Sequence, residues 1–140
     1  MVVMEKTKHL LGEEHPHTLT SMSNLAVTYQ KMGQWKKAEA LQVLAMEKSQ
    51  HVLGEEHPDT LIRMAHLAAT YSEQDQWKEA ETLQVVVMEK SKHILGEEHP
   101  HTLIRMSNLA AMYSKQGRWK EAEALQVAVV EKTKHSLENV

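Results

Sequence analysis

A six-residue string, LGEEHP, occurs three times in the chain and gives it an internal period of 42 residues. Residues 54–95 and 96–137 are identical at 30 of 42 positions, and residues 12–53 and 54–95 are identical at 26. Self-similarity at such a period is the signature of repeat architectures, in which each repeat packs on its neighbours. We therefore expect an array of stacked repeats rather than one globular core.

Each repeat contains two stretches whose apolar residues recur at the spacing of an amphipathic α-helix. In the first repeat these residues are Leu19, Met22, Leu25, Ala26 and Tyr29, followed by Trp35, Ala38, Leu41 and Ala45. Pro16 suits a first helical turn because its missing N–H would be unpaired there, and Gly33 suits the left-handed end of a helix. We predict helix A at about residues 16–32 and helix B at about residues 35–53.

The repeat frame defines the expected domain organisation. We treat residues 1–140 as a single repeat domain with full repeats at 12–53, 54–95 and 96–137. Residues 1–11 match only a second helix and form a partial repeat, and residues 138–140 form a tail. We therefore expect the chain to be a piece of a longer array.

Composition excludes several classes of function. Sixteen basic and 19 acidic residues give a net charge of −3 without a basic stripe, which argues against nucleic acid and membrane surfaces as partners. The chain has no cysteine, no long apolar run and no secretory signal, so we expect a soluble, cytoplasmic protein. No phosphate-binding GxxxxGK[ST] loop occurs either.

The residues that carry a family resemblance are most complete in the first repeat. In the first repeat they are Asn24, Leu25, Ala26, Tyr29, Gly33, Trp35, Ala38, Glu39 and Ala45. This pattern resembles the tetratricopeptide repeat. The period of 42 and the HPxTL start at residues 15–19 are similar to kinesin-light-chain-type repeats, and most of all to the repeat arrays of fungal NOD-like receptor (NB-ARC/TPR) proteins.

The resemblance implies an all-α, right-handed superhelical solenoid of antiparallel helix pairs. It also implies a protein–protein interaction scaffold that binds a peptide or protein segment on a concave face formed by the A helices, as part of a larger signalling or sensor protein. The chain departs from the family pattern at Gln42, Gln84 and Gln126, where a bulky aromatic residue is usual on helix B. It also has Asp75 in place of the turn glycine, which we expect to lower stability.

The positions that differ between repeats indicate where a ligand would bind. Packing positions such as Leu19, Leu61 and Leu103 repeat, whereas one other face of helix A varies. We predict that this face is the ligand-binding groove, formed by Thr20, Asn24, Val27, Lys31, Ile62, His66, Ala69, Glu73, Ile104, Asn108, Ala111 and Lys115. By resemblance, Asn24 and Asn108 fall where asparagines hold a peptide backbone in kinesin light chains. Neutral variation on a solvated face would leave the same pattern.

Enzymatic and metal-binding functions are not favoured. The polar residues recur with the repeat instead of converging, so we expect no enzyme, no cofactor and no metal site. The pair His99 and His101 could suggest a metal ligand set. We interpret His15, His57 and His99 as helix caps, with the intervening proline directing the two rings apart. The tryptophans at 35, 77 and 119 and the tyrosines are expected to be core residues.

Self-association is the alternative function. Both ends of the chain are B helices without a following or preceding A helix, and terminal repeats need polar outer faces to stay apart. The apolar residues concerned are Val2, Val3, Leu10, Leu125, Val129 and Val130. In this interpretation the chain is a structural array that forms homo-oligomers through its uncapped terminal helices.

Overall fold

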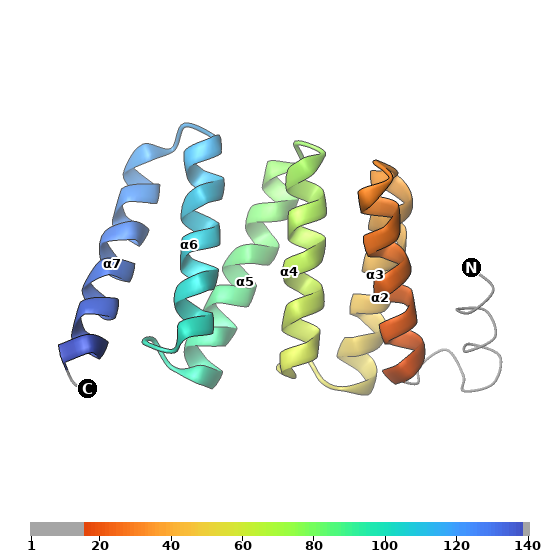
Figure 1. The fold of residues 1–140 in the computed structure, drawn as a ribbon, viewed down its shortest axis with the longest axis horizontal. Helices are drawn as coiled ribbons and strands as arrows, with labels where there is room; N and C mark the ends of the chain where they lie inside the picture. Colours follow the sequence, from red (N-terminus) through yellow and green to blue (C-terminus); the bar gives the residue numbers. More distant parts are fainter. Residues whose placement is uncertain (1–15, 139–140) are drawn as a thin grey trace. The chain divides into compact units, whose positions relative to one another are not determined.

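The structure of the protein is a computed structural model that describes residues 16–138, so the predictions for residues 1–11 and for His15 lie outside the described residues. The described part contains only α-helices, which Figure 1 shows in chain order. They are α2 (Pro16–Lys31), α3 (Trp35–Val52), α4 (Pro58–Glu73), α5 (Trp77–Leu95), α6 (Pro100–Lys115) and α7 (Trp119–Glu138). The predicted bounds of α2 and α3 agree closely with these.

Histidine and proline together begin the A helices. The Nδ1 atom of His57 accepts a hydrogen bond of 3.1 Å from the backbone N–H of Asp59, and Pro58 occupies the first helical turn. His99 repeats this cap with a bond of 3.0 Å from the N–H of His101. Each ring thereby satisfies one of the N–H groups that a helix start leaves without a partner. The predicted capping role is confirmed for both histidines.

The turn inside each repeat requires a left-handed residue. Gly33 and Gly117 provide it with φ of 75°, and Asp75 takes the same place with φ of 60°. Carboxamide and carboxylate side chains tolerate this conformation better than most, but a Cβ atom still crowds the following carbonyl. Asp75 therefore keeps the shape of the turn and bears a strain that glycine avoids.

The chain forms two compact units, which we describe separately. In the N-terminal unit, residues 16–76, α3 packs against both α2 and α4. Leu19, Met22 and Ala45 are buried together there, with Leu41 packed against them. In the C-terminal unit, residues 77–138, α6 packs against both α5 and α7.

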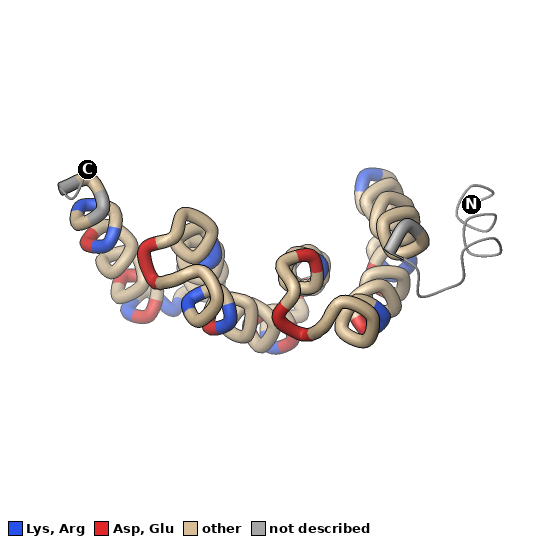
Figure 2. The backbone as a smooth tube through the Cα atoms, turned by 90° about the horizontal axis from the view of Figure 1, so that it is seen from below, with Lys and Arg blue, Asp and Glu red and all other residues tan. Residues whose placement is uncertain are grey.

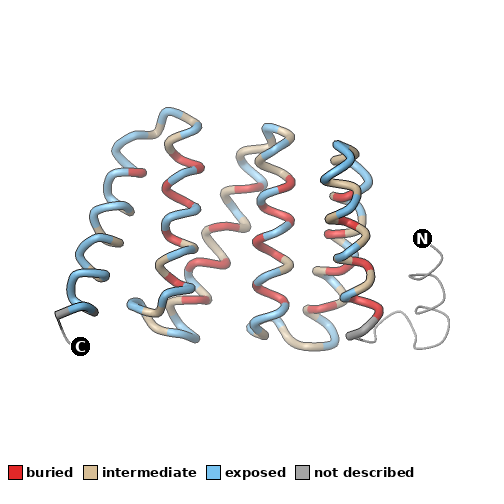
Figure 3. Tube along the Cα trace, viewed as in Figure 1, coloured by how far each residue is buried: buried red, intermediate tan, exposed pale blue. Residues whose placement is uncertain are grey.

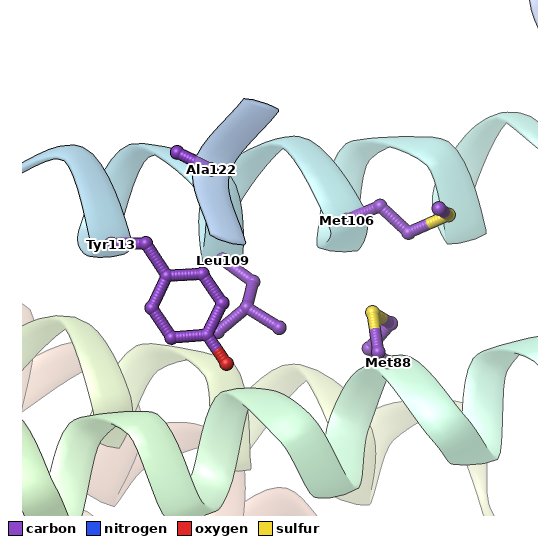
Figure 4. Close-up of a cluster of buried hydrophobic side chains, with 5 residues drawn as sticks. All are labelled: Met88, Met106, Leu109, Tyr113 and Ala122. Carbon is purple, nitrogen blue, oxygen red and sulfur yellow. The ribbon is translucent and has the colours of Figure 1, made fainter. Parts of the chain in front are cut away.

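The core of the C-terminal unit lies where α6 meets its two neighbours. Met88 of α5, Met106, Leu109 and Tyr113 of α6, and Ala122 of α7 are buried together (Figure 4). Burial recurs along α6 at helical spacing, as Figure 3 shows. Leucine and methionine from the A helix thus fill the space between successive B helices.

Two predictions about apolar residues are wrong in part. Tyr113 is buried and Trp35 and Trp77 are half-buried, but Trp119 is 67% exposed, because no further helix of the described chain covers the start of α7. Leu125 and Val129 were expected to be exposed with Val130, yet both are half-buried against the core of the C-terminal unit. Val130 is 62% exposed, as expected.

Candidate functional site

The predicted ligand-binding residues lie on the solvent-exposed face of each A helix. We call them the A-helix stripe, and every member is exposed except Val27, which is half-buried. Within each helix the members are three or four residues apart, so they share one face. They are Thr20, Asn24, Val27 and Lys31 of α2, Ile62, His66, Ala69 and Glu73 of α4, and Ile104, Asn108, Ala111 and Lys115 of α6.

The face of the A helices that repeats in sequence is the buried one. Met22, Met64 and Met106 are 1%, 4% and 2% exposed, and Leu67 and Leu109 are each 1% exposed. Packing therefore accounts for the residues that stay the same between repeats. It does not dictate the residues of the A-helix stripe, which are the positions that differ.

In the N-terminal unit, Arg63 of α4 joins three helices beside the stripe. Its Nε atom donates a hydrogen bond of 2.7 Å to Oγ of Ser49 in α3, and its Nη1 atom donates one of 2.9 Å to Oγ of Ser23 in α2. Burial lowers the pKa of Arg63, and the nearby carboxylate of Asp59 opposes this shift. The charge is partly desolvated, so its hydroxyl partners fix the guanidinium in place.

A small cavity opens beside this arginine. It is lined by Ser23, Gln42, Ala45, Arg63 and the stripe residue His66, and its volume of about 10 Å³ suits one water molecule. Its walls carry hydroxyl, amide and guanidinium groups. The stripe of the N-terminal unit therefore borders a polar recess rather than a closed apolar core.

Glutamine on helix B is part of a buried hydrogen-bond chain. Nε2 of Gln30 donates to Oγ1 of Thr70 at 2.6 Å, and that hydroxyl donates to Oε1 of Gln42 at 2.5 Å. Gln42 is 5% exposed. Its departure from the usual aromatic residue is therefore accommodated by Thr70, which supplies the proton that the buried amide oxygen needs.

The equivalent arginine of the C-terminal unit does not form these bonds, although Ser91 of α5 is the counterpart of Ser49. Arg105 is half-buried in α6, and the described residues provide its side chain with no hydrogen bond or ion pair. Desolvation lowers the pKa of Arg105. Arg105 is one helical turn from Asn108 of the stripe, in the position that Arg63 holds relative to His66. It is a partly buried cation that an incoming carboxylate would stabilise.

Charge is distributed unevenly around the helices. Figure 2 shows acidic loops between α3 and α4 and between α5 and α6, where the exposed pairs Glu55–Glu56 and Glu97–Glu98 precede the A helices. Carboxylates are favourable near the positive N-terminus of a helix. One position of the stripe changes its charge between repeats: it is basic in α2 and α6, as Lys31 and Lys115, and acidic in α4, as Glu73.

Arg118 closes the turn before α7 with acidic partners. It pairs with Glu81 of α5 and with Glu121 of α7, and its guanidinium lies 4.4 Å from the centre of the Tyr113 ring. The hydrogen bonds that Arg118 donates to Glu121 and Glu81 raise the pKa of Arg118, and the bond accepted from Arg118 lowers the pKa of Glu121. Gln34 and Gln76 stand at this position in the other two full repeats, and a neutral glutamine cannot form these ion pairs.

Among residues 16–138, no group of three or more histidine, aspartate or glutamate side chains is arranged to hold a metal ion. The rings of His99 and His101 were expected to point apart, and this is wrong: their centroids are 5.1 Å apart in an edge-to-face contact. The Nδ1 atom of His99 is used in the helix cap. In the same part of the chain, no helix is long and apolar enough to cross a membrane.

Comparison with protein families identifies the type of repeat that forms the array. Residues 17–89, more than half of the 140 residues, match a tetratricopeptide-repeat family, and residues 102–139 match a second tetratricopeptide-repeat family. The chain belongs to the tetratricopeptide-repeat family. Tetratricopeptide repeats generally mediate protein–protein interaction. A search of curated proteins found no significant match.

Solved structures of similar tetratricopeptide arrays have the same fold. Two come from Podosopora anserina and are named for a putative kinesin light chain with nearly identical TPR-like repeats. The first, which carries a point substitution, superposes with a TM-score of 0.87 at 29% identity, covering 97% of this chain and 64% of that one. The second superposes with a TM-score of 0.85 at 30% identity, covering 96% and 64%.

BtubC (BKLC) from P. vanneervenii shares the fold at 17% identity, with a TM-score of 0.86 and coverage of 99% of this chain and 55% of that chain. The chain thus spans less than two thirds of the length of these three relatives. The predicted all-α, tetratricopeptide-like solenoid class and the likeness to kinesin-light-chain repeats are confirmed.

Sequence reasoning missed the polar contacts beneath the stripe. Arg63, Ser49 and Thr70 were not singled out, although Ser49 recurs as Ser91 and Arg63 as Arg105. A polar residue that repeats on an otherwise apolar helical face is a signal for a buried hydrogen bond. The hydrogen bond of Thr70 could not be inferred in this way. Thr70 is replaced by Met112 one repeat later, and the residue that it contacts, Gln42, lies on a different helix.

Proposed function

We propose that the chain binds a peptide or protein segment on the A-helix stripe, without chemistry and without a cofactor. The observation that carries the proposal is the division of each A helix into a buried face that repeats and an exposed face that varies. Stability requires the first face and leaves the second free to be shaped by a ligand.

The side chains of the stripe suit an extended chain. Asn24 and Asn108 are exposed and carry both a donor and an acceptor, which is what a peptide backbone needs. Ile62 of α4 is 40% exposed, and Ile104, which lies one turn from Asn108 on the same face of α6, is 51% exposed, so both offer apolar contact. A ligand that combines backbone hydrogen bonds with an aliphatic side chain would use both kinds of group.

The charges beside the stripe favour an acidic ligand. Arg105 is half-buried without a partner among the described residues, and Lys115 is exposed on the same helix. A carboxylate from the ligand would offset the desolvation of Arg105, whereas a basic ligand would add to it. We therefore propose that the bound segment carries at least one aspartate or glutamate.

A random peptide display library tests this proposal. Peptides selected on the whole chain are synthesised with a fluorescent label, and their Kd is measured by anisotropy. We expect Lys115→Ala and Arg105→Gln to weaken binding by about five- to tenfold, the effect of losing roughly one charge-assisted hydrogen bond. Lys120→Ala removes an exposed lysine of α7 outside the stripe and serves as the matched control.

Two results would contradict the proposal. One is a set of selected peptides whose Kd responds to Lys120→Ala as strongly as to Lys115→Ala. The other is a set without enrichment of acidic residues and with a Kd that does not depend on salt, because charge pairing at an exposed surface is screened by ions.

Self-association is a second candidate, favoured by the exposure of Val127 and Val130 on α7 at 54% and 62%. Light scattering at low and high protein concentration tests it. A mass that rises with concentration and returns to 16.0 kDa in a Val130→Lys variant would support it. A constant mass of one chain would contradict it.

The wider setting of the chain is also a proposal. The likeness to the arrays of fungal NOD-like receptors and a cytoplasmic location both remain predictions from the sequence. Detection of a nucleotide-binding module in the same polypeptide as these repeats would support the first.

A further inference from the structure

We infer that Arg105 of α6 determines where an acidic side chain of the ligand binds, and that Arg63, its counterpart in α4, does not take part. Arg105 is then the residue that fixes the register of the bound segment on the A-helix stripe. The inference rests on the proposed function, because it concerns the ligand of that stripe.

The two arginines occupy the same position of successive repeats and are both half-buried. Each stands three residues before a member of the stripe, Arg63 before His66 and Arg105 before Asn108. Desolvation by burial lowers the pKa of both guanidinium groups. Either group would gain from an acceptor, so the residues around it decide whether it is still available to a ligand.

The N-terminal unit provides Arg63 with partners of its own. Its Nε and Nη1 atoms donate hydrogen bonds of 2.7 and 2.9 Å to the hydroxyls of Ser49 and Ser23. The carboxylate of Asp59, one helical turn before Arg63, favours the charged form of the guanidinium. A ligand carboxylate at Arg63 would compete with both hydroxyls and be repelled by Asp59.

The sequence removes two of these three groups one repeat later. Ala65 stands at the repeat position of Ser23 and has no hydroxyl, and His101 stands at the position of Asp59. Both replacements precede Arg105 in the chain. The nearby carboxylate that offsets desolvation at Arg63 therefore has no counterpart at this repeat position.

The third group is kept, but without the hydrogen bond. Ser91 of α5 is the counterpart of Ser49 and is 2% exposed. Its backbone carbonyl accepts a hydrogen bond of 3.1 Å from the hydroxyl of Thr102. The described residues provide Arg105 with no hydrogen bond or ion pair, so its donors are available to a ligand.

The charge of the stripe changes in the same sense. Lys115 is exposed ten residues after Arg105, and Glu73 is exposed at the equivalent position of α4. An α-helix rises 1.5 Å per residue, so the two cations of α6 are about 15 Å apart along the helix axis. An acidic segment would meet a cation towards each end of α6, whereas on α4 it would meet Glu73.

The probe is the tightest-binding peptide selected on the whole chain by display. Each of its aspartates and glutamates is replaced singly by the amide, and the Kd is measured by anisotropy. One replacement should weaken binding to the wild type by about five- to tenfold and have little effect on the Arg105→Gln chain, because the two groups form one pair. Arg63→Gln is the matched control, and the same replacement should keep its full effect there.

A reversal of charge separates pairing from a structural role of Arg105. Arg105→Glu should weaken the acidic peptide by more than about tenfold, because like charges then face each other. A variant peptide with lysine at the same position should bind the Arg105→Glu chain more tightly than the acidic peptide does. Circular dichroism verifies that the variant remains folded.

The pattern of α6 can also be transferred to α4. A new selection on the Arg105→Gln chain should show less enrichment of acidic residues than a selection on the wild type. Adding Ser23→Ala, Asp59→His and Glu73→Lys gives Arg63 the sequence surroundings of Arg105. This chain should again select acidic peptides, and their Kd should now depend on Arg63.

Three results would overturn the inference. The first is an acidic residue of the peptide that couples to Arg63→Gln and not to Arg105→Gln. The second is an Arg105→Glu chain that loses affinity for the acidic and the lysine peptide alike. The third is a transferred chain that selects no acidic peptides.

Failure of the inference can be told apart from failure of the proposed function. Binding that weakens with Asn108→Ala, while no acidic residue of the peptide couples to Arg105, would leave the stripe as the binding site and overturn the inference alone. Selected peptides whose Kd responds to neither Asn108→Ala nor Arg105→Gln would overturn both.

Discussion

The hydroxyl of Thr70 donates a hydrogen bond of 2.5 Å to Oε1 of Gln42, but one repeat later Met112 stands where the hydroxyl would be. Oε1 of Gln84 is consequently buried without a partner among the described residues. A single repeat position therefore contains a satisfied amide in one unit and an unsatisfied amide in the other, although both glutamines are nearly equally buried, at 5% and 6% exposed.

We predict opposite effects for the same substitution at these two glutamines. Gln84→Met removes an unsatisfied buried oxygen at nearly constant volume and should raise the free energy of unfolding by about 1 kcal/mol. Gln42→Met deletes the acceptor of Thr70 and should lower it by about 1 kcal/mol. Urea denaturation followed by circular dichroism measures both, and effects of the same sign would contradict the described hydrogen bonds.

The turn at Asp75 provides a prediction about backbone strain. Asp75 has φ of 60°, in the region where glycine meets no steric cost. Asp75→Gly should therefore raise the melting temperature, by an amount equivalent to roughly 1 kcal/mol. Gly33→Ala, at the same turn position with φ of 75°, should lower stability by a similar amount. A destabilised Asp75→Gly variant would show that the aspartate makes a contact worth more than the strain.

Two neighbouring valines of α7 separate its inner face from its outer face. Val129 is half-buried against the core of the C-terminal unit, and Val130 is 62% exposed. Val129→Lys should lower the free energy of unfolding by about 1–2 kcal/mol, whereas Val130→Lys should change it by less than about 0.5 kcal/mol. Thermal denaturation of the two variants checks the orientation of α7, and equal effects would mean that the helix is rotated.

The ion pair between Arg118 and Glu121 predicts a pH dependence. Its hydrogen bond lowers the pKa of Glu121 in the folded state. The pair therefore contributes stability above the unfolded pKa of glutamate, about 4.3, and loses it as the pH falls through the lower folded value. The melting temperature of the wild type should fall more steeply over this acidic range than that of Glu121→Gln. Parallel curves for the two proteins would contradict the pairing.

The sequence alone predicted the helices and their caps well, for physical reasons. Pro58 and Pro100 with their preceding histidines act through local geometry, and the leucine and methionine spacing reports directly which face is buried. The period of 42 residues then extended each local assignment to the next repeat.

The features that the sequence did not predict depend on the contacts between helices. The exposure of Trp119 and the burial of Val129 follow from what packs against α7, and Trp119 occupies the same sequence context as Trp35 and Trp77. The bonds from Arg63 to Ser23 and Ser49 join residues 40 and 14 positions apart, so the repetition of Arg63 and Ser49 marks two polar positions without identifying the residues that they contact. The A-helix stripe could be located from sequence variation within the chain, but its polar surroundings could not.

The central claim is that a ligand contacts the A-helix stripe. Backbone amide NMR on the whole chain, titrated with an acidic peptide selected from the display library, tests it most directly. The account predicts that the largest shifts fall at stripe residues such as Asn24, His66 and Asn108 and at Arg105, while Gln126 and Val130 of α7 do not move. Shifts concentrated on the B helices, such as at Val127 and Val130 of α7, with the stripe unchanged, would contradict it.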